Sequence, residues 1–159
     1  MNVLYITYDG LLDPLGNSQI LPYIKGISTH QDGVVILSFE KPERFSQGQR
    51  LMLSEIMNHK IHWKPLRFTK DLGFMGKLWD LSRMYFWSFY LANKYSVRVV
   101  HARSHSPAQV GLFLKRVLKK KHIFDFRGLW VDERIDKGGR DLCNFFDRLQ
   151  YKNVEFLMV

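Results

Sequence analysis

The feature that most constrains the fold is a regular alternation of short apolar runs with longer amphipathic stretches. The runs that predict strands are residues 2–8, 34–39, 61–65, 97–102 and 122–126. Apolar residues at helical spacing fill the stretches between them, at 18–28, 45–58, 76–95 and 107–120, and continue from 141 onward. Because alternating strands and helices build parallel sheets with right-handed crossovers, the sequence predicts an α/β, doubly wound, Rossmann-like domain.

Residue types typical of helix ends refine these boundaries. Ser18 is the expected N-cap of the first helix, with Pro22 in or just past its first turn. Ser106 is the expected N-cap of the fourth helix, with Pro107 at its first position. The stretch that ends at Val159 has no C-capping glycine and no following strand, so we expect the chain to stop inside an element, with a partner domain beyond it.

Length and cysteine content narrow the class of protein. The chain has 159 residues, which suits one domain with a real core. Its one cysteine, Cys143, excludes an intrachain disulfide and a cysteine-based zinc site, and favours a reducing compartment. The N-terminus lacks the pattern of a signal peptide, and no apolar run is long enough to span a bilayer. We therefore expect a cytoplasmic protein.

The positive charge is confined to the middle of the chain. The formal net charge is +9, and residues 61–121 hold 13 Lys and Arg against 2 Asp and Glu, whereas the segments on either side are each close to neutral. Such a block predicts contact with an anionic partner, namely phospholipid head groups, nucleic acid or a phosphorylated substrate. The alternative is a basic face that has no specific partner.

The first candidate site is the loop after the first expected strand, because ligands of parallel α/β sheets bind beyond the carboxyl ends of the strands. Gly10 and Gly16 would let the backbone approach a ligand, and Asn17 and Ser18 open a helix whose N-terminus favours an anion. Neither a GxGxxG fingerprint nor a P-loop is present, which argues against a classical dinucleotide or nucleoside triphosphate site. An ordinary β–α turn is the alternative.

Two further loops at the same expected edge carry polar side chains. His101, Arg103 and His105 precede a helix, where histidine can titrate near neutral pH and arginine can bind phosphate; metal ligation and simple packing are the alternatives. The long loop after the last expected strand mixes carboxylates, arginine and tryptophan, which suits hydroxyl-rich ligands, with a surface salt-bridge network as the alternative. Its candidates are Asp125, Arg127, Trp130, Asp132 and Glu133.

At these three loops the chain resembles the N-terminal domain of GT4-type glycosyltransferases, which have the two-domain GT-B fold. The matching segments are NVLYITYDGLLDPLGNSQILPYIKGIS, VVHARSHSPAQVGLFLKR and FDFRGLWVDER, which together cover about a third of the chain. The resemblance implies a domain that mostly binds the acceptor, and a C-terminal domain outside this chain that mostly binds a nucleotide diphosphate sugar. It also implies transfer, with retention of configuration and without a bound metal, to a saccharide or lipid-linked acceptor in the synthesis of bacterial surface polysaccharide or glycolipid.

The resemblance also assigns roles to particular residues. Gly16 matches the glycine loop that reaches toward the donor phosphates, although LLDPLGN replaces the usual tandem glycines. His101, Arg103 and His105 cover the segment where many relatives place a histidine near the reacting sugar. Asp125 and its neighbours match the loop that lines the acceptor side.

A second partner is expected from residues 78–95, LWDLSRMYFWSFYLANKY, which are aromatic nearly all round and flanked by basic residues. That composition is typical of a helix lying on an anionic membrane surface, and the contact candidates are Trp79, Arg83, Phe86, Trp87 and Tyr90. A core helix between the sheet and a partner domain is the alternative. Two other functions remain open, namely a basic nucleic-acid-binding module without a recognised motif, and an inactive fragment that lacks the donor site.

Overall fold

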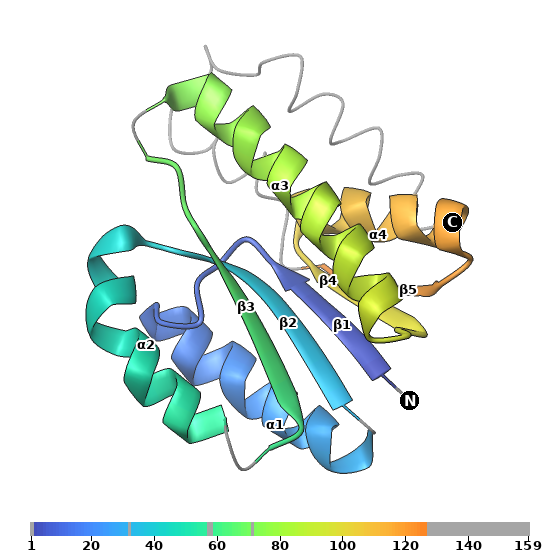
Figure 1. Cartoon of the computed structure of the whole chain (residues 1–159), viewed down its shortest axis with the longest axis horizontal. Coiled ribbons are helices and arrows are strands. Elements are labelled where there is room, and N and C mark those ends of the chain that lie inside the picture. Colours follow the sequence, from blue (N-terminus) through green and yellow to red (C-terminus); the bar gives the residue numbers. More distant parts are fainter. Residues whose placement is uncertain (1, 32, 57–58, 71, 127–159) are drawn as a thin grey trace.

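A five-stranded sheet forms the centre of the protein in the computed structural model, which describes residues 2–31, 33–56, 59–70 and 72–126 (Figure 1). The strands are β1 (Asn2–Thr7), β2 (Gly33–Glu40), β3 (Ile61–Arg67), β4 (Val99–Arg103) and β5 (Lys121–Asp125). All neighbouring pairs are parallel, in the order β3-β2-β1-β4-β5. The predicted α/β, doubly wound, Rossmann-like architecture is confirmed.

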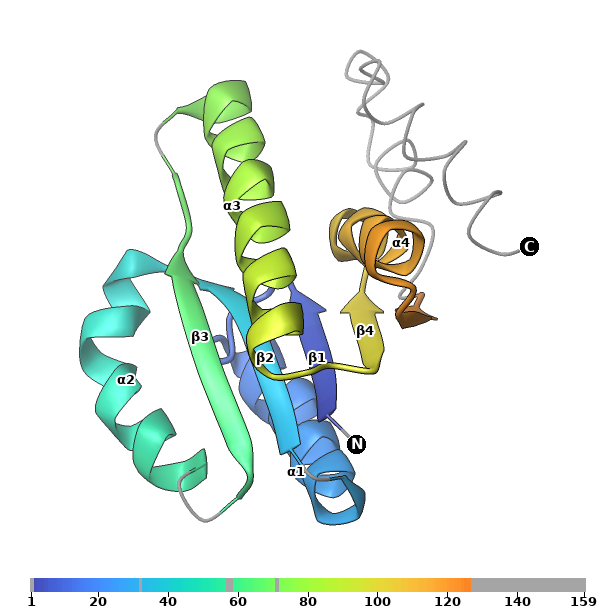
Figure 2. The ribbon, with the colours of Figure 1, turned by 45° about the vertical axis from the view of Figure 1, so that its right-hand side comes forward.

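Helices cover both faces of the sheet. The π-helical turn η1 (Gly16–Ile20) leads into α1 (Leu21–His30), which lies with α2 (Pro42–Ile56) on one face, while α3 (Gly73–Lys94) and α4 (His105–Leu118) lie on the other (Figure 2). Because side chains alternate along a strand, β1 supplies both layers. Its Tyr5 packs with α1 and α2, whereas Leu4 and Ile6 pack with α3 and α4. No helix within the described ranges combines the length and apolar character needed to cross a bilayer.

The edge position of β3 explains why the sequence signalled it only weakly. Proline cannot donate to a strand ladder, so Pro65 marked the expected end of this strand. In the structure β3 continues to Arg67, because it pairs with β2 alone and a missing N–H on the open side costs nothing.

The first helix begins earlier than expected, and Ser18 is not its N-cap. The Asn17 N–H already donates to the Asp13 carbonyl (2.9 Å), so helical bonding starts before Ser18. Ser18 lies inside η1, and its hydroxyl reaches back to the Leu15 carbonyl (3.5 Å). Pro22 explains the irregular turn, because its ring crowds the preceding turn and its nitrogen cannot bond the Ser18 carbonyl. A π-helical turn directly before it accommodates this break.

The fourth helix also begins before its expected start, and Ser106 is not its N-cap. That position is taken by Ser104, whose carbonyl accepts the Ala108 N–H (3.1 Å). Pro107 is therefore the third helical residue rather than the first, which is tolerated because the first-turn N–H groups have no helical partner in any case. Ser104 itself has φ 71° and ψ 175°, a conformation that non-glycine residues rarely adopt.

Candidate functional site

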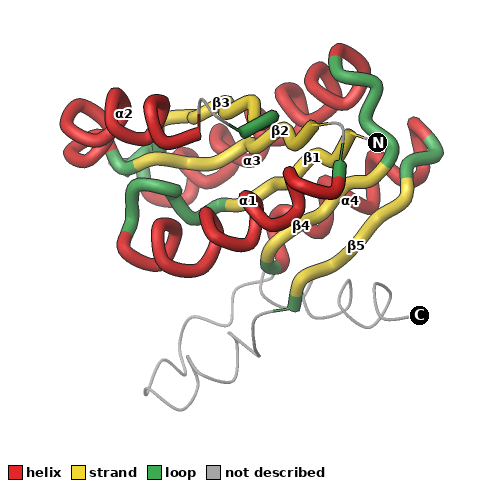
Figure 3. Tube along the Cα trace, turned by 90° about the horizontal axis from the view of Figure 1, so that it is seen from below, coloured by secondary structure: helices red, strands yellow, loops and turns green. Residues whose placement is uncertain are grey.

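The parallel register brings the carboxyl ends of β1, β4 and β5 to one edge of the sheet (Figure 3). Thr7 is paired with Arg103, and Arg103 with Asp125, so the three strands end side by side. The Ser104 N–H then donates to the Asp125 carbonyl (3.0 Å), which joins the second loop to the third. Of the expected third-loop residues, Arg127, Trp130, Asp132 and Glu133 lie outside the described residues.

The strand order reverses between β1 and β4, and this fixes where a ligand would bind. The chain leaves β1 toward the face covered by α1, and it leaves β4 toward the opposite face through α4. In open α/β sheets, ligands bind beyond the carboxyl ends of the strands at this point of reversal. The Thr7–Arg103 pair stands there.

Arg103 is the central side chain of this edge. It is 2% exposed, and its Nη2 donates to the Gln19 Oε1 (2.9 Å) while its Nε lies 3.5 Å from the Asp9 Oδ2. Its Nη1 is buried and has no hydrogen-bond partner within the part of the chain that the structure describes. Burying a guanidinium costs free energy unless its N–H groups have hydrogen-bond acceptors. This arrangement therefore suits an anionic ligand.

His101 lies two residues before Arg103, on the same face of β4 and deeper in the sheet. Its ring is 4.9 Å from that of Tyr5 and 5.4 Å from that of Tyr23, measured between centroids. Its Nδ1 lies 3.3 Å from the Tyr23 hydroxyl. His101 is only 5% exposed, and the half-exposed Tyr23 connects it to the surface of α1.

His105 does not join this group. It is the first residue of α4, and its ring packs edge-on against Phe124 and Phe126, at 5.9 and 5.7 Å between centroids. Burial lowers the pKa of the His105 imidazole, which favours its neutral form. Of the three residues expected together, the structure brings His101 and Arg103 to one face and turns His105 toward β5.

Gly10 and Gly16 are explained by packing within the first loop, which differs from the expected approach of the backbone to a ligand. A Cβ at Gly16 would overlap the Gly10 carbonyl, and one at Gly10 would lie 2.6 Å from the Glu40 Oε2. The Glu40 carboxylate, at the end of β2, accepts the N–H groups of Leu11 (2.8 Å) and Leu12 (3.1 Å). These loop amides thus bind a protein carboxylate and are not available to a ligand.

The N-terminus of α4 supplies further positive groups at this edge. The helical ladder of α4 starts with the Ala108 N–H, so the amides of His105 and Ser106 precede it. Asn17 and Ser18 are exposed in η1, but the Asn17 N–H already donates to the Asp13 carbonyl (2.9 Å) and is not free for a ligand. Amides at helix N-termini favour negative charge, as Arg103 does.

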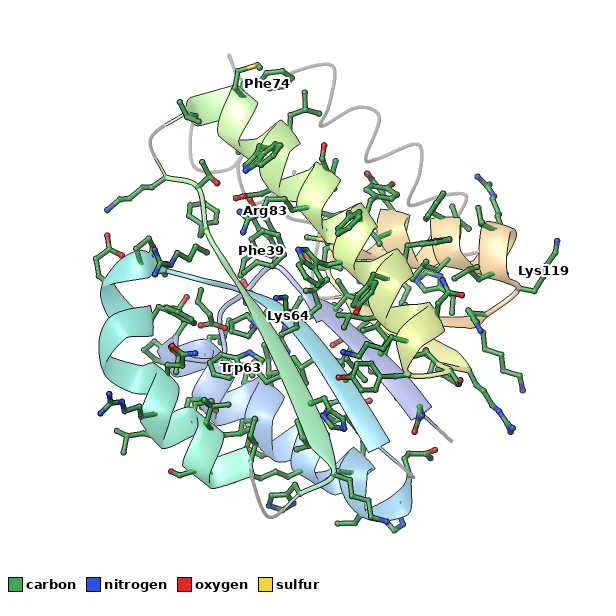
Figure 4. All side chains as sticks on the ribbon, in the orientation of Figure 1. Phe39, Trp63, Lys64, Phe74, Arg83 and Lys119 are labelled. Carbon is green, nitrogen blue, oxygen red and sulfur yellow. The ribbon has the colours of Figure 1, made fainter. Side chains whose placement is uncertain are left out.

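The membrane-contact candidates divide into two groups on α3. Trp79, Phe86 and Tyr90 are exposed. Arg83 instead turns inward over the Phe39 ring and donates to Asp80, which is completely buried (Figure 4). Trp87 is partly buried and packs against the core.

Sequence reasoning missed Gln19, Tyr23 and Glu40. Glu40 carried a readable signal, because a carboxylate directly after a buried apolar run places charge at a strand's carboxyl end. Gln19 and Tyr23 gave none, since their role depends on how far η1 turns them toward β4.

Fold and site together define a class: a Rossmann-like α/β protein with a buried arginine at the point of strand reversal. Within the described ranges, no three His, Cys, Asp or Glu side chains gather where they could hold a metal ion. No protein-family model and no curated protein matches the chain.

Proposed function

We propose that this chain is the N-terminal, acceptor-side domain of a GT-B glycosyltransferase. The enzyme transfers a sugar from a nucleotide diphosphate sugar to a hydroxyl group of a saccharide or lipid-linked acceptor. The resemblance of three segments motivates the proposal, and the Rossmann-like fold is compatible with it. In this proposal most of the donor site belongs to a second domain.

The observation that carries the proposal is the buried Nη1 of Arg103, which has no hydrogen-bond partner among the described residues. Glycosyl transfer from such a donor releases a diphosphate, so negative charge develops on the leaving group. A buried guanidinium directly before the N-terminus of α4 stabilises such charge without a metal ion. The contacts of Arg103 with Gln19 and Asp9 hold its guanidinium in place before the ligand arrives.

His101 and Tyr23 are the groups nearest to a possible acceptor in this proposal. Tyr23 is half-exposed and contacts His101 through its hydroxyl, so a proton can pass between an acceptor hydroxyl and the imidazole along this pair. His105 has no such path, since its ring faces two phenylalanines.

Binding of a diphosphate to this chain tests the proposal. Titration of the isotope-labelled protein with sodium pyrophosphate, followed by two-dimensional NMR, is expected to shift the amide signals of the non-proline residues within 9–19 and 104–108. Arg103→Gln is expected to abolish these shifts, and Arg103→Lys to weaken them, because lysine keeps the charge but loses the planar fork. The dispersion of each variant's spectrum shows whether it is folded.

Arg98→Gln is the matched control, because Arg98 is exposed and stands at the opposite end of β4. It is expected to leave the pyrophosphate response unchanged. No response of the parent chain, or an equal loss in both variants, would contradict the proposal. Binding of arbitrary oligonucleotides that weakens equally in both variants would instead favour the nucleic-acid-binding module.

A further inference from the structure

A cavity lies at the amino-terminal edge of the sheet, opposite the edge that carries Arg103. It has a volume of about 280 Å³ and is lined by residues at the start of β1, β2 and β3 and by the residue that directly follows α3. These residues are Asn2, Gly33, Val35, Lys60, His62 and Tyr95. In Figure 1 the end of α3 lies beside the start of β1, where the Asn2 Nδ2 donates to the Tyr95 carbonyl (2.5 Å).

The cavity exists because β2 begins with a glycine. A Cβ at Gly33 would stand 3.3 Å from the Asn2 Oδ1 and 3.6 Å from the Lys60 carbonyl, so a side chain there would enter the space between β1 and β3. The φ of Gly33 is not positive, and the backbone therefore does not require glycine at this position. Because glycine weakens a strand and often marks a place where a ligand approaches, the open space at Gly33 indicates a binding site.

The walls of the cavity combine apolar and polar groups. Val35 is 2% exposed and forms an apolar floor. The His62 and Tyr95 rings stack on each other, with 4.8 Å between centroids and 29° between planes. The bond from the Asn2 Nδ2 to Tyr95 fixes the side-chain amide of Asn2, whose Oδ1 faces Gly33 as an acceptor. An apolar floor and aromatic rings with a few fixed polar groups are typical of a small-molecule site.

Charge and size narrow the kind of ligand. Among the described residues, no aspartate or glutamate lines the cavity, whereas Lys60 lines it and is exposed. A second ammonium group, that of Lys94, lies 5.3 Å from the centre of the Tyr95 ring. These charges favour an anion. The volume is close to the lower limit of small-molecule sites, roughly 300 Å³, which suits one ring with its substituents and not a nucleotide.

We propose that this cavity binds a small hydroxylated aromatic carboxylate. The ring lies between Val35 and the His62–Tyr95 pair, the carboxylate faces Lys60, and the hydroxyl group donates to the Asn2 Oδ1. An inorganic anion fits less well, because it would leave the floor and the aromatic rings uncovered. The proposal stands apart from the proposed function, since the cavity and Arg103 lie at opposite edges of the sheet.

Titration with 4-hydroxybenzoate, followed by two-dimensional NMR of the isotope-labelled chain, tests the proposal. Saturable shifts are expected for the amide signals of Gly33, Val35, Lys60, His62 and Tyr95, and none for those of residues 104–108. Two related compounds separate the contributions of charge and ring. The uncharged 4-hydroxybenzamide is expected to bind about two- to fivefold more weakly, because an exposed ion pair is lost. Acetate, which lacks the ring, is expected not to reach saturation.

Three variants locate the ligand. Gly33→Val is expected to abolish binding, because its side chain fills the cavity while valine itself suits a strand. Lys60→Gln changes only an exposed side chain and is expected to weaken binding about two- to fivefold. Lys121→Gln is the matched control, since Lys121 is an exposed lysine at the start of β5, and it is expected to bind as the parent does. The dispersion of each spectrum shows whether the variant is folded.

Four outcomes would overturn the proposal. The first is the absence of saturable shifts in the parent chain, and the second is unchanged binding by folded Gly33→Val. The third is an equal loss in Lys60→Gln and Lys121→Gln, which would mean attraction by overall charge alone. The fourth is a response confined to residues 9–19 and 104–108, which would place the aromatic acid at the edge that carries Arg103.

Discussion

At the scale of single residues, two positions in the loop after β1 have no room for a side chain. Gly16 faces the Gly10 carbonyl so closely that no side chain fits between them, and Gly10 in turn lies against Glu40. The loop therefore folds back on itself and brings Asp9 to Arg103.

Gly16→Ala is expected to lower the free energy of unfolding by about 2–4 kcal/mol, because the added methyl group must displace backbone and not a flexible side chain. Urea unfolding measures the change. Gly26→Ala is the matched control, since Gly26 lies inside α1 with open space around it. There the substitution is expected to raise the free energy of unfolding by about 0.5–1 kcal/mol. Equal effects at the two positions would contradict this account of the loop.

At the scale of elements, the start of α4 is strained. Ser104 leaves β4 with φ 71° and ψ 175°, and its side chain makes no capping hydrogen bond. Strain of this kind is retained at sites where the backbone must turn sharply beside a ligand. Here the turn follows Arg103 directly and points the helix N-terminus at the sheet edge.

Ser104→Gly is expected to raise the free energy of unfolding by about 1 kcal/mol, since glycine adopts this backbone conformation without a Cβ clash. Ser96→Gly provides the comparison, because Ser96 has φ 48°, in the milder left-handed region. The stability of both variants is measured in urea. A gain at Ser104 no larger than that at Ser96 would show that the start of α4 stores no particular strain.

The elements themselves could be predicted from the sequence, because apolar periodicity decides which face of a strand or helix is buried. Their starts could not. Ser18 and Ser106 have the right chemistry for N-caps, but Pro22 forces a π-helical turn and Pro107 fits a later position in the first turn. Both effects depend on three-dimensional crowding that a residue's type does not reveal.

At the scale of the whole molecule, the candidate site could be predicted in position but not in composition. Parallel strands had to end at one edge, so the loops after β1 and β4 had to meet. The choice between His101, Arg103 and His105 depends on the direction of each side chain. His101 and Arg103 are two residues apart on β4, so both side chains lie on the face covered by α1. His105 instead begins α4 and packs on Phe124.

Glu40 is expected to make the stability of the whole domain depend on pH. Burial raises the pKa of its carboxyl above the ordinary value of 4.5, and the nearby Asp13 adds to the rise, against the hydrogen bonds from Ser38 and the loop amides. The folded chain thus holds the proton more tightly than the unfolded chain does. Its contribution to stability is complete below the ordinary pKa and is lost as the pH rises through the raised one.

The measurement is urea unfolding of the parent chain and of Glu40→Gln at a series of pH values, from below 4.5 to above the raised pKa of Glu40. The parent is expected to lose stability relative to the variant as the pH rises. A difference that stays constant, or that grows in favour of the parent, would mean that the hydrogen bonds to the carboxylate outweigh its burial.

The pairing of Thr7 with Arg103 has a consequence for how the protein is made. During synthesis, β1, β2 and β3 can assemble into a small sheet before β4 exists, and that early sheet lacks the buried Arg103. Closing the long loop between β1 and β4 carries an entropic cost that local contacts avoid. The candidate site around Arg103 therefore forms only when the second half of the chain docks on the first.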